Sequence, residues 1–301
     1  MKALVSGATG FVGGGLARLL AERGHEVRGL VRDRGRASGL EAEGFELHEG
    51  DVLDADSLRG AGSGVDVAYY LVHSMGRGGD EGFAERERRA AAGFARMAAG
   101  EGVGRVIYLG GLGEPRSEHL LSRAETAQVL AAEGPPLTYL RASMVIGAAS
   151  ESYRTLRYLV ERLPAMIAPA WLRNRTQPIA AGDVLEYLAQ AGERDDVAGL
   201  EVQVGGADVL TYGRLLDLMA DVLGRRRRPK LPVPLLSPKL SSHWIGFVTP
   251  VDAGVARPLV ESLASETVVT DPAPASLFDV HPIGSAEALR RARAEETAAH
   301  A

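Results

Sequence analysis

The sequence contains no cysteine, which excludes disulfide bonds, thiolate nucleophiles and cysteine-ligated metals. It also lacks any run of about 18 apolar residues, so we expect no membrane-spanning segment. The seven histidines are scattered without the paired spacing of metal ligands, and no metal site is expected. The missing cysteines fit a reducing cytoplasm, which is the location we expect.

An excess of positive charge is missing as well. The formal net charge is -5, which gives no reason to expect a nucleic-acid partner. The first apolar segment begins within a few residues of Met1, so we expect no signal peptide. What remains is an ordinary globular composition: the 301 residues, 46% of them hydrophobic, suffice for one large α/β domain with a small cap.

Short apolar segments alternate with helical patterns through the first half of the chain. Apolar segments of this kind are typical of strands buried on both faces of a sheet. Their alternation with helices implies right-handed crossovers and parallel pairing. The sequence therefore predicts an α/β fold with a Rossmann-type doubly wound sheet, with strands at 3–7, 25–31, 45–48, 65–72, 105–109 and 137–146 and helices at 11–23, 83–99 and 117–132.

The pattern becomes less regular after Gly147. We predict helices at 153–162, 183–190 and 212–223 and a short strand at 201–204. We therefore expect residues 1–150 to form the Rossmann domain. Residues 151–301 are expected to form a smaller substrate lobe that is interleaved with late Rossmann elements.

A glycine-rich turn joins the first predicted strand to the first helix. Gly7 lets the strand turn tightly, Gly10 lets the backbone approach a pyrophosphate, and Gly13 lets the helix pack closely on the strand. Free N–H groups at the positive helix end would then hold the phosphates. The alternative is a tight turn without a ligand, but the surrounding strand order favours dinucleotide binding. The expected cofactor contacts here are Gly7, Thr9, Gly10, Phe11, Val12 and Gly13.

The end of the second predicted strand bears on the choice between NAD(H) and NADP(H). A carboxylate there accepts from the ribose hydroxyls, whereas an arginine accommodates the 2′-phosphate. Arg32 is the first residue after the strand and Arg36 lies nearby, so NADP(H) is favoured over NAD(H) for the 1–150 domain. The alternative is that both arginines are solvated and Asp33 binds the ribose.

Two further loops are expected to contact the dinucleotide. After the third strand, Asp51 is suited to accept from the adenine amine while Val52 packs on the ring. An aspartate in such a loop is just as often a turn former. After the fourth strand, His73 and Ser74 lie where the ribose and pyrophosphate normally pass, with simple loop residues as the alternative.

Several longer stretches resemble a known family, the atypical short-chain dehydrogenases/reductases. The resemblance is to the bacterial NAD(P)H-binding YbjT-like group, which is related to NmrA-like redox sensors and to the NAD(P)H-binding accessory subunit of respiratory complex I. It covers nearly the whole chain and implies the fold and the nicotinamide cofactor. The stretches are Tyr70-Leu-Val-His-Ser-Met75, Tyr108-Leu-Gly-Gly-Leu-Gly113, His119-Leu-Leu-Ser-Arg123, Leu140-Arg-Ala-Ser-Met-Val-Ile-Gly147 and Gln177-Pro-Ile179.

Enzymes of this family carry a tyrosine four residues before a lysine, and a serine after the fifth strand. The tyrosine protonates the carbonyl that receives the hydride, and the lysine holds the ribose and lowers the tyrosine pKa. This chain instead has His119 and Arg123 at that spacing, and the glycine loop 110–113 replaces the serine. His119 is a candidate proton donor, or a residue that caps or packs the helix. Arg123 is a candidate ribose contact, and Tyr108, on a buried strand, is expected in the core.

The resemblance places the segment after the sixth strand beside the nicotinamide. The candidate substrate-pocket residues are Ser143, Tyr153, Met166 and Trp171, each of which could instead be a packing residue. The favoured function is NADPH-dependent reduction of a small hydrophobic carbonyl or enone. The alternative is a non-catalytic NADP(H)-binding redox sensor or assembly protein, and an isomerase ranks lower. We expect a monomer or a homodimer with a small-molecule substrate.

Overall fold

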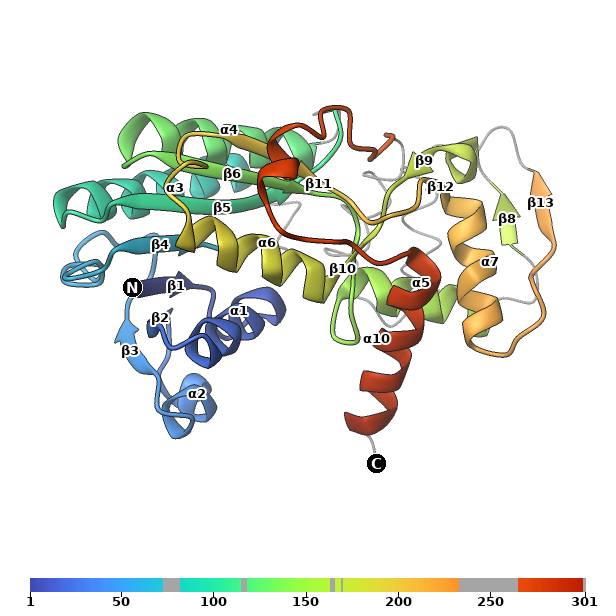
Figure 1. Cartoon of the computed structure of the whole chain (residues 1–301), viewed down its shortest axis with the longest axis horizontal. Coiled ribbons are helices and arrows are strands. Elements are labelled where there is room, and N and C mark those ends of the chain that lie inside the picture. The colour runs from blue at the N-terminus through green and yellow to red at the C-terminus, as the bar shows by residue number, and fades with distance from the viewer. Residues whose placement is uncertain (73–81, 115–117, 163–165, 169, 233–264, 300–301) are drawn as a thin grey trace.

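The computed structural model describes residues 1–72, 82–114, 118–162, 166–168, 170–232 and 265–299 (Figure 1). A seven-stranded parallel sheet forms its centre, with strand order β11-β6-β5-β4-β1-β2-β3. The chain therefore starts in the middle of the sheet and winds to one edge and then to the other, which confirms the predicted doubly wound topology. The strands are β1 (Lys2–Ser6), β2 (Glu26–Val31), β3 (Glu46–Glu49), β4 (Val67–Tyr70), β5 (Arg105–Gly111), β6 (Leu137–Ala142) and β11 (Glu201–Val204).

Helices cover both faces of this sheet and shield its apolar strands from water. α1 (Phe11–Glu22) and α6 (Ala181–Glu193) pack together on one face, and α3 (Phe83–Gly100) and α4 (Glu118–Glu133) on the other. The short helix α2 (Ser38–Ala42) precedes β3. Successive side chains of a strand point to opposite faces of the sheet. In β4, Tyr69 therefore packs on the face covered by α1 and α6, and Tyr70 packs on the face covered by α3.

One predicted strand is divided, and the division directs the chain out of the sheet. The segment predicted at 137–146 forms β6 and then, after a break, β7 (Val145–Ile146), which pairs with β10 (Ile179–Ala180) outside the main sheet. The strand predicted at 65–72 is also shorter, because β4 covers only Val67–Tyr70. β11, from the predicted short strand at 201–204, becomes the seventh strand by pairing with β6.

A second apolar core lies beyond the carboxyl ends of the sheet strands. It is built by α5 (Glu151–Arg162), α7 (Tyr212–Val222) and α10 (Ser285–Ala299), which lie to one side of the sheet in Figure 1. Two small sheets accompany them, one pairing β9 (Arg175–Thr176) with β12 (Leu210–Thr211) and one pairing β8 (Met166–Ala168) with β13 (Lys230–Pro232). These three helices fall within residues 151–301, where the sequence predicts a substrate lobe, and the substrate role of this part stays a prediction.

Candidate cofactor and active site

The turn after β1 has the close backbone approaches that only glycine permits. A Cβ atom at Gly13 would lie 2.2 Å from the carbonyl oxygen of Gly7, and one at Gly7 would lie 2.8 Å from the carbonyl oxygen of Leu71. Gly7 also has a φ of 70°, a left-handed conformation that residues with a Cβ adopt at a cost. The turn is closed by the Gly10 amide, which donates to the Gly7 carbonyl at 2.8 Å.

The start of α1 is left open for an anion. Gly10 is the N-cap residue and no side chain caps the helix. The amides of the first turn have no intrahelical acceptor, and the helix dipole is positive at this end. Thr9, Gly10 and Phe11 are exposed and Val12 is partly exposed, so the turn faces outward. The donor set and the missing Cβ atoms fit a dinucleotide pyrophosphate.

Phe11 brings the glycine turn into contact with the segment after β7. A Cβ atom at Gly147 would lie 2.5 Å from Cζ of the Phe11 ring, so a side chain at position 147 would require this ring to move. The expected cofactor turn and the expected substrate flank are therefore neighbours. The sequence predicts a site role for each of these two segments separately. It does not predict their contact, because the contact depends on the tertiary fold.

The three arginines that follow β2 differ in their contacts. Asp33 accepts from the Arg36 amide at 3.2 Å and lies 3.7 Å from the Arg36 guanidinium. Arg34 donates to the carbonyl of Leu47 at 3.0 Å. Arg32 is exposed, and no described residue forms a hydrogen bond or ion pair with it. Arg32 thus has no partner among the described residues, whereas the exposed Arg36 side chain lies beside Asp33.

Asp51 and Val52 occupy the loop after β3. An Asp51 carboxylate oxygen accepts from the Leu53 amide at 2.9 Å, which is the turn-forming role weighed above. Val52 is buried in the core beside α3, in the same cluster as Leu58. The loop lies at the carboxyl edge of the sheet, where adenine is expected, but the Val52 side chain is already used for packing.

Four predicted site residues have side chains outside the described part of the chain. His73 and Ser74 lie outside the described residues. His119 is part of α4 and Met166 is part of β8, but their side chains are also outside the described part of the chain. Their expected roles stay predictions.

Arg123 lies at the carboxyl end of β5, as the cofactor hypothesis requires. Its guanidinium Nη1 is 3.5 Å from the Leu109 carbonyl, and its positive charge lowers the pKa of the Tyr108 and Tyr139 phenols against the larger raising effect of their burial. A permanently charged guanidinium at this edge can hold a ribose hydroxyl or a developing alkoxide.

In the glycine loop 110–113, where the family's serine is expected, side chains of neighbouring elements fill the space beside Gly110 and Gly111. A Cβ atom at Gly110 would lie 2.6 Å from Cε2 of Tyr139, and one at Gly111 would lie 2.7 Å from Cδ2 of Leu120. Sequence reasoning noted the glycines but missed Tyr139. The sequence carries no local signal for this contact, because it depends on the parallel register of β5 and β6, in which Tyr108 lies opposite Tyr139.

Tyr108 belongs to the core, as predicted. It is 1% exposed and stacks on Tyr139, with ring centroids 5.2 Å apart and planes inclined by 13°. Tyr70 continues the row at 5.9 Å, and Phe94 of α3 covers Tyr70 at 5.0 Å. Burial raises the pKa of Tyr108 above its usual value, so this phenol stays protonated near neutral pH.

The described pocket candidates are all buried. Tyr153 has no exposed surface, and its hydroxyl donates to Glu296 of α10 at 3.2 Å. Trp171 packs edge-on against Tyr212, with ring centroids 6.5 Å apart. Both therefore act as packing residues of the lobe in this structure, which is the alternative stated for them above.

Ser143 joins a cluster of four buried hydroxyls that the sequence did not reveal. It donates to Thr267 at 3.1 Å, Thr267 donates to Thr176 at 2.9 Å, and the Tyr212 hydroxyl lies 3.3 Å from that of Thr267. The four residues come from four separate segments, so no local motif could mark them. The cluster fixes the end of β6 against the lobe.

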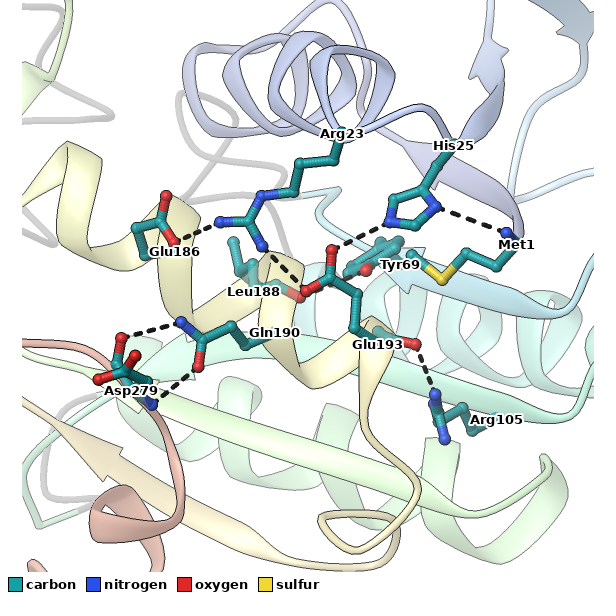
Figure 2. Close-up of polar contacts among 11 residues, drawn as sticks. Met1, Arg23, His25, Tyr69, Arg105, Glu186, Leu188, Gln190, Glu193 and Asp279 are labelled. Carbon is teal, nitrogen blue, oxygen red and sulfur yellow. Dashed lines mark hydrogen bonds and ion pairs between the residues drawn. The ribbon is translucent and has the colours of Figure 1, made fainter.

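The opposite, amino edge of the sheet carries a groove of about 580 Å³ lined by residues such as His25, Asp66 and Arg105. Figure 2 shows the polar contacts beside it: Glu193 at the end of α6 accepts from Arg23 and contacts His25, each at 2.9 Å. Because the glycine turn follows the carboxyl end of β1, this groove is distinct from the cofactor site.

Within the described ranges, no group of three or more His, Cys, Asp or Glu side chains is arranged to hold a metal ion. Among those same residues, no helix is both long enough and apolar enough to cross a membrane.

The parallel sheet and the open glycine turn define the class: this is a Rossmann-type protein that binds a nicotinamide dinucleotide. The comparison with family models makes the assignment specific. Residues 7–204 match the NAD(P)H-binding family, and the chain belongs to that family.

Known proteins agree with this assignment at the level of the fold. The triphenylmethane reductase of Citrobacter sp., solved with NADP(H), superposes with a TM-score of 0.76 at 17% identity, over 97% of this chain and 100% of that one. The NADPH-dependent quinone oxidoreductase of Escherichia coli, solved with NADPH, gives a TM-score of 0.75 at 20% identity over 96% and 98%.

Among curated sequences, an uncharacterized protein of Mycobacterium tuberculosis is 26% identical over 235 residues, which is 77% of this chain and 24% of that protein. This chain thus spans about a quarter of the length of that relative. The 2-alkyl-3-oxoalkanoate reductase of Stenotrophomonas maltophilia is 30% identical over 109 residues, 36% of this chain and 32% of that one.

Proposed function

We propose that this protein is an NADPH-dependent oxidoreductase that reduces a small hydrophobic carbonyl or enone. The observation that carries the proposal is the pairing of an open glycine turn with two cations at the same sheet edge. Arg32 lies at the end of β2 and Arg123 at the end of β5, on either side of the turn. Three proteins that are similar in sequence or fold are named as reductases or oxidoreductases, which supports the proposed activity.

The chain's own residues would bind the cofactor at three points. The amides at the start of α1 would hold the pyrophosphate, and Arg32 would pair with the 2′-phosphate. The competing carboxylate, Asp33, already accepts from Arg36 and so is less suited to a ribose. The proposed preference for NADP(H) over NAD(H) follows from this difference between Arg32, which would bind the 2′-phosphate, and Asp33, which already has a partner.

Reduction needs a proton on the substrate oxygen and stabilisation of the charge that develops there. The bound nicotinamide supplies a hydride to the carbonyl or enone carbon. Arg123 would stabilise the negative charge on the oxygen, and His119 or an ordered water would donate the proton. His119 lies one helical turn from Arg123 in α4, so both belong to the same helix face.

The test is NADPH oxidation followed by absorbance with a panel of ketones, quinones and enones. The wild type is expected to consume NADPH with at least one class, and His119→Ala to lower kcat while leaving the Kd for NADPH unchanged. His281→Ala, an exposed histidine of the C-terminal segment, is the matched control. Absence of any substrate-dependent oxidation across the panel would contradict the proposal.

A non-catalytic NADP(H) sensor or assembly protein is the second candidate. The glycines at positions 110 and 111 favour it, because Tyr139 and Leu120 occupy the space of the family's serine. It predicts tight NADPH binding without turnover, together with a ligand-dependent change in shape or partner. Small-angle scattering and size-exclusion chromatography with and without NADPH separate the two candidates.

A further inference from the structure

The groove at the amino edge of the sheet has the size of a small-molecule site, and the proposed function does not use it. Its volume is about 580 Å³, and small-molecule sites commonly measure about 300–1,000 Å³. The starts of β4 and β5 and the end of α6 line it, with Met1 and His25 on one side. These segments are far apart in the sequence, so only the fold brings them together.

Carboxylates outnumber permanent cations in the lining of this groove. Asp66, Glu193 and Asp195 line it, against the single guanidinium of Arg105. Glu193 already has a partner on each carboxylate oxygen, both at 2.9 Å (Figure 2). The acceptors that are open to a ligand are therefore those of Asp66 and Asp195.

The Asp66 and Asp195 carboxylates each have one oxygen in use. Oδ2 of Asp66 accepts from the Lys2 amide at 2.6 Å, and Oδ1 of Asp195 accepts from Arg105 Nη1 at 2.5 Å. Within the described ranges, no residue donates to the second oxygen of either carboxylate. Both residues are exposed, and the Asp195 side chain fully so. A ligand that carries N–H groups can thus reach two acceptors from solvent.

Helix ends make the same edge of the sheet electrostatically negative. α1, α3 and α6 end at Glu22, Gly100 and Glu193, and residues that follow each of these ends border the groove. A helix dipole is negative at its carboxyl end, where the last carbonyls have no intrahelical donor. Backbone amides close the last turns of α1 and α3, but no described backbone amide closes that of α6. The end of α6 therefore offers further acceptors.

Arg105 is an example, within the chain itself, of a cation bound at this edge. Its Nη2 donates to the carbonyl of Gly192, in the last turn of α6, and its Nη1 donates to Asp195, each at 2.5 Å. A helix carbonyl and a carboxylate thus hold a guanidinium whose side chain is only 11% exposed. A metal ion is a poorer match, because the described residues contain no group of three or more His, Cys, Asp or Glu side chains arranged to hold one.

We propose that this groove binds a small organic cation whose primary ammonium or guanidinium group donates to Asp66 and Asp195. An ammonium of this kind has three donors and a guanidinium up to five, so one ligand can serve both carboxylates and a carbonyl at the end of α6. Val65 and Val67 line the same groove and would contact the alkyl part of the ligand. The site does not depend on the reductase function, because it lies at the opposite edge of the sheet from the glycine turn.

Isothermal titration calorimetry of the full chain with putrescine, a linear diamine, and with methylguanidinium tests the proposal. Tetramethylammonium, a cation without N–H donors, is the ligand control. We expect Asp66→Asn and Asp195→Asn each to raise the Kd for putrescine by about 10-fold, which is the effect of one charge-assisted hydrogen bond. Asp196→Asn is the matched control, because this exposed carboxylate pairs with Arg194 and does not line the groove.

Three results overturn the proposal. They are the absence of binding by both probes at about 10 mM, equally tight binding of tetramethylammonium, and a Kd for putrescine that neither Asp66→Asn nor Asp195→Asn changes. Hydrogen–deuterium exchange with putrescine locates the site independently of any variant. Protection is expected at 65–67, 102–105 and 192–195, and protection confined to other segments also overturns the proposal. Circular dichroism checks each variant, and if one unfolds, the other variant and the exchange map decide.

Discussion

The carboxylate of Asp33 accepts a hydrogen bond from the backbone amide of Arg36 at 3.2 Å. This contact closes the loop after β2 and draws the Arg36 guanidinium to within 3.7 Å of the same carboxylate. The adjacent Arg32 has no such partner among the described residues. Two arginines that look equivalent in the sequence therefore differ in their surroundings, since Arg36 lies beside a carboxylate and Arg32 does not.

Arg32→Ala is expected to raise the Kd for NADPH by about 10- to 100-fold, because a charge-assisted hydrogen bond contributes about 1.5–3 kcal/mol. The Kd for NADH, which has no 2′-phosphate, should hardly change. Isothermal titration calorimetry with both cofactors measures the ratio. Arg36→Ala is the matched control, and an equal loss in both variants would contradict the assignment of Arg32.

Gly13→Ala is expected to abolish NADPH binding, because its Cβ would lie 2.2 Å from the Gly7 carbonyl oxygen and force the turn open. Gly182→Ala is the control: it lies in the first turn of α6, and a Cβ there would meet nothing within 4 Å. Calorimetry for binding and circular dichroism for folding separate the two effects. A Gly13→Ala variant that binds NADPH like the parent would remove the structural basis for the cofactor site.

Introducing a serine at position 110, within the glycine loop that replaces the family's serine, is expected to destabilise the protein rather than activate it. The Cβ of Gly110→Ser would lie 2.6 Å from the Tyr139 ring, and an overpacked core costs about 1–3 kcal/mol. Tyr139→Ala in the same chain should relieve the overlap. Urea denaturation of the two single variants and the double variant forms the cycle, and simple additivity would show that the two residues do not compete for space.

These side-chain relationships mark what the sequence could and could not predict. The glycine spacing after β1 and the alternation of strands and helices are local patterns, and they were sufficient for the fold and the cofactor class. The contact of Gly110 with Tyr139 depends on strand register, and the groove at the amino edge depends on how the end of α6 packs beside β4 and β5. Arg32 and Arg36 cannot be told apart in the sequence, because only the folded structure shows that Arg36 lies beside Asp33.

The Tyr153 phenol predicts an alkaline limit to stability. Burial, the charge of Glu296 and the hydrogen bond to it raise the pKa of Tyr153 from 10.0 to about 12. The unfolded chain loses this proton first as the pH rises, so the contribution is complete below pH 10.0 and is lost as the pH approaches 12. Urea titrations over this range should show a smaller loss of unfolding free energy in Tyr153→Phe, and an equal loss would contradict the link.

The late return of the chain to its sheet has a practical consequence. Helix α6 and strand β11 come after the excursion into the lobe, yet they cover one face and one edge of the sheet. A fragment that stops at residue 150 would leave Leu140 and Ile107 facing water and would expose the β6 edge to pairing with other chains. Expression trials that aim for a minimal nucleotide-binding piece should therefore extend at least through β11, or they will yield aggregates.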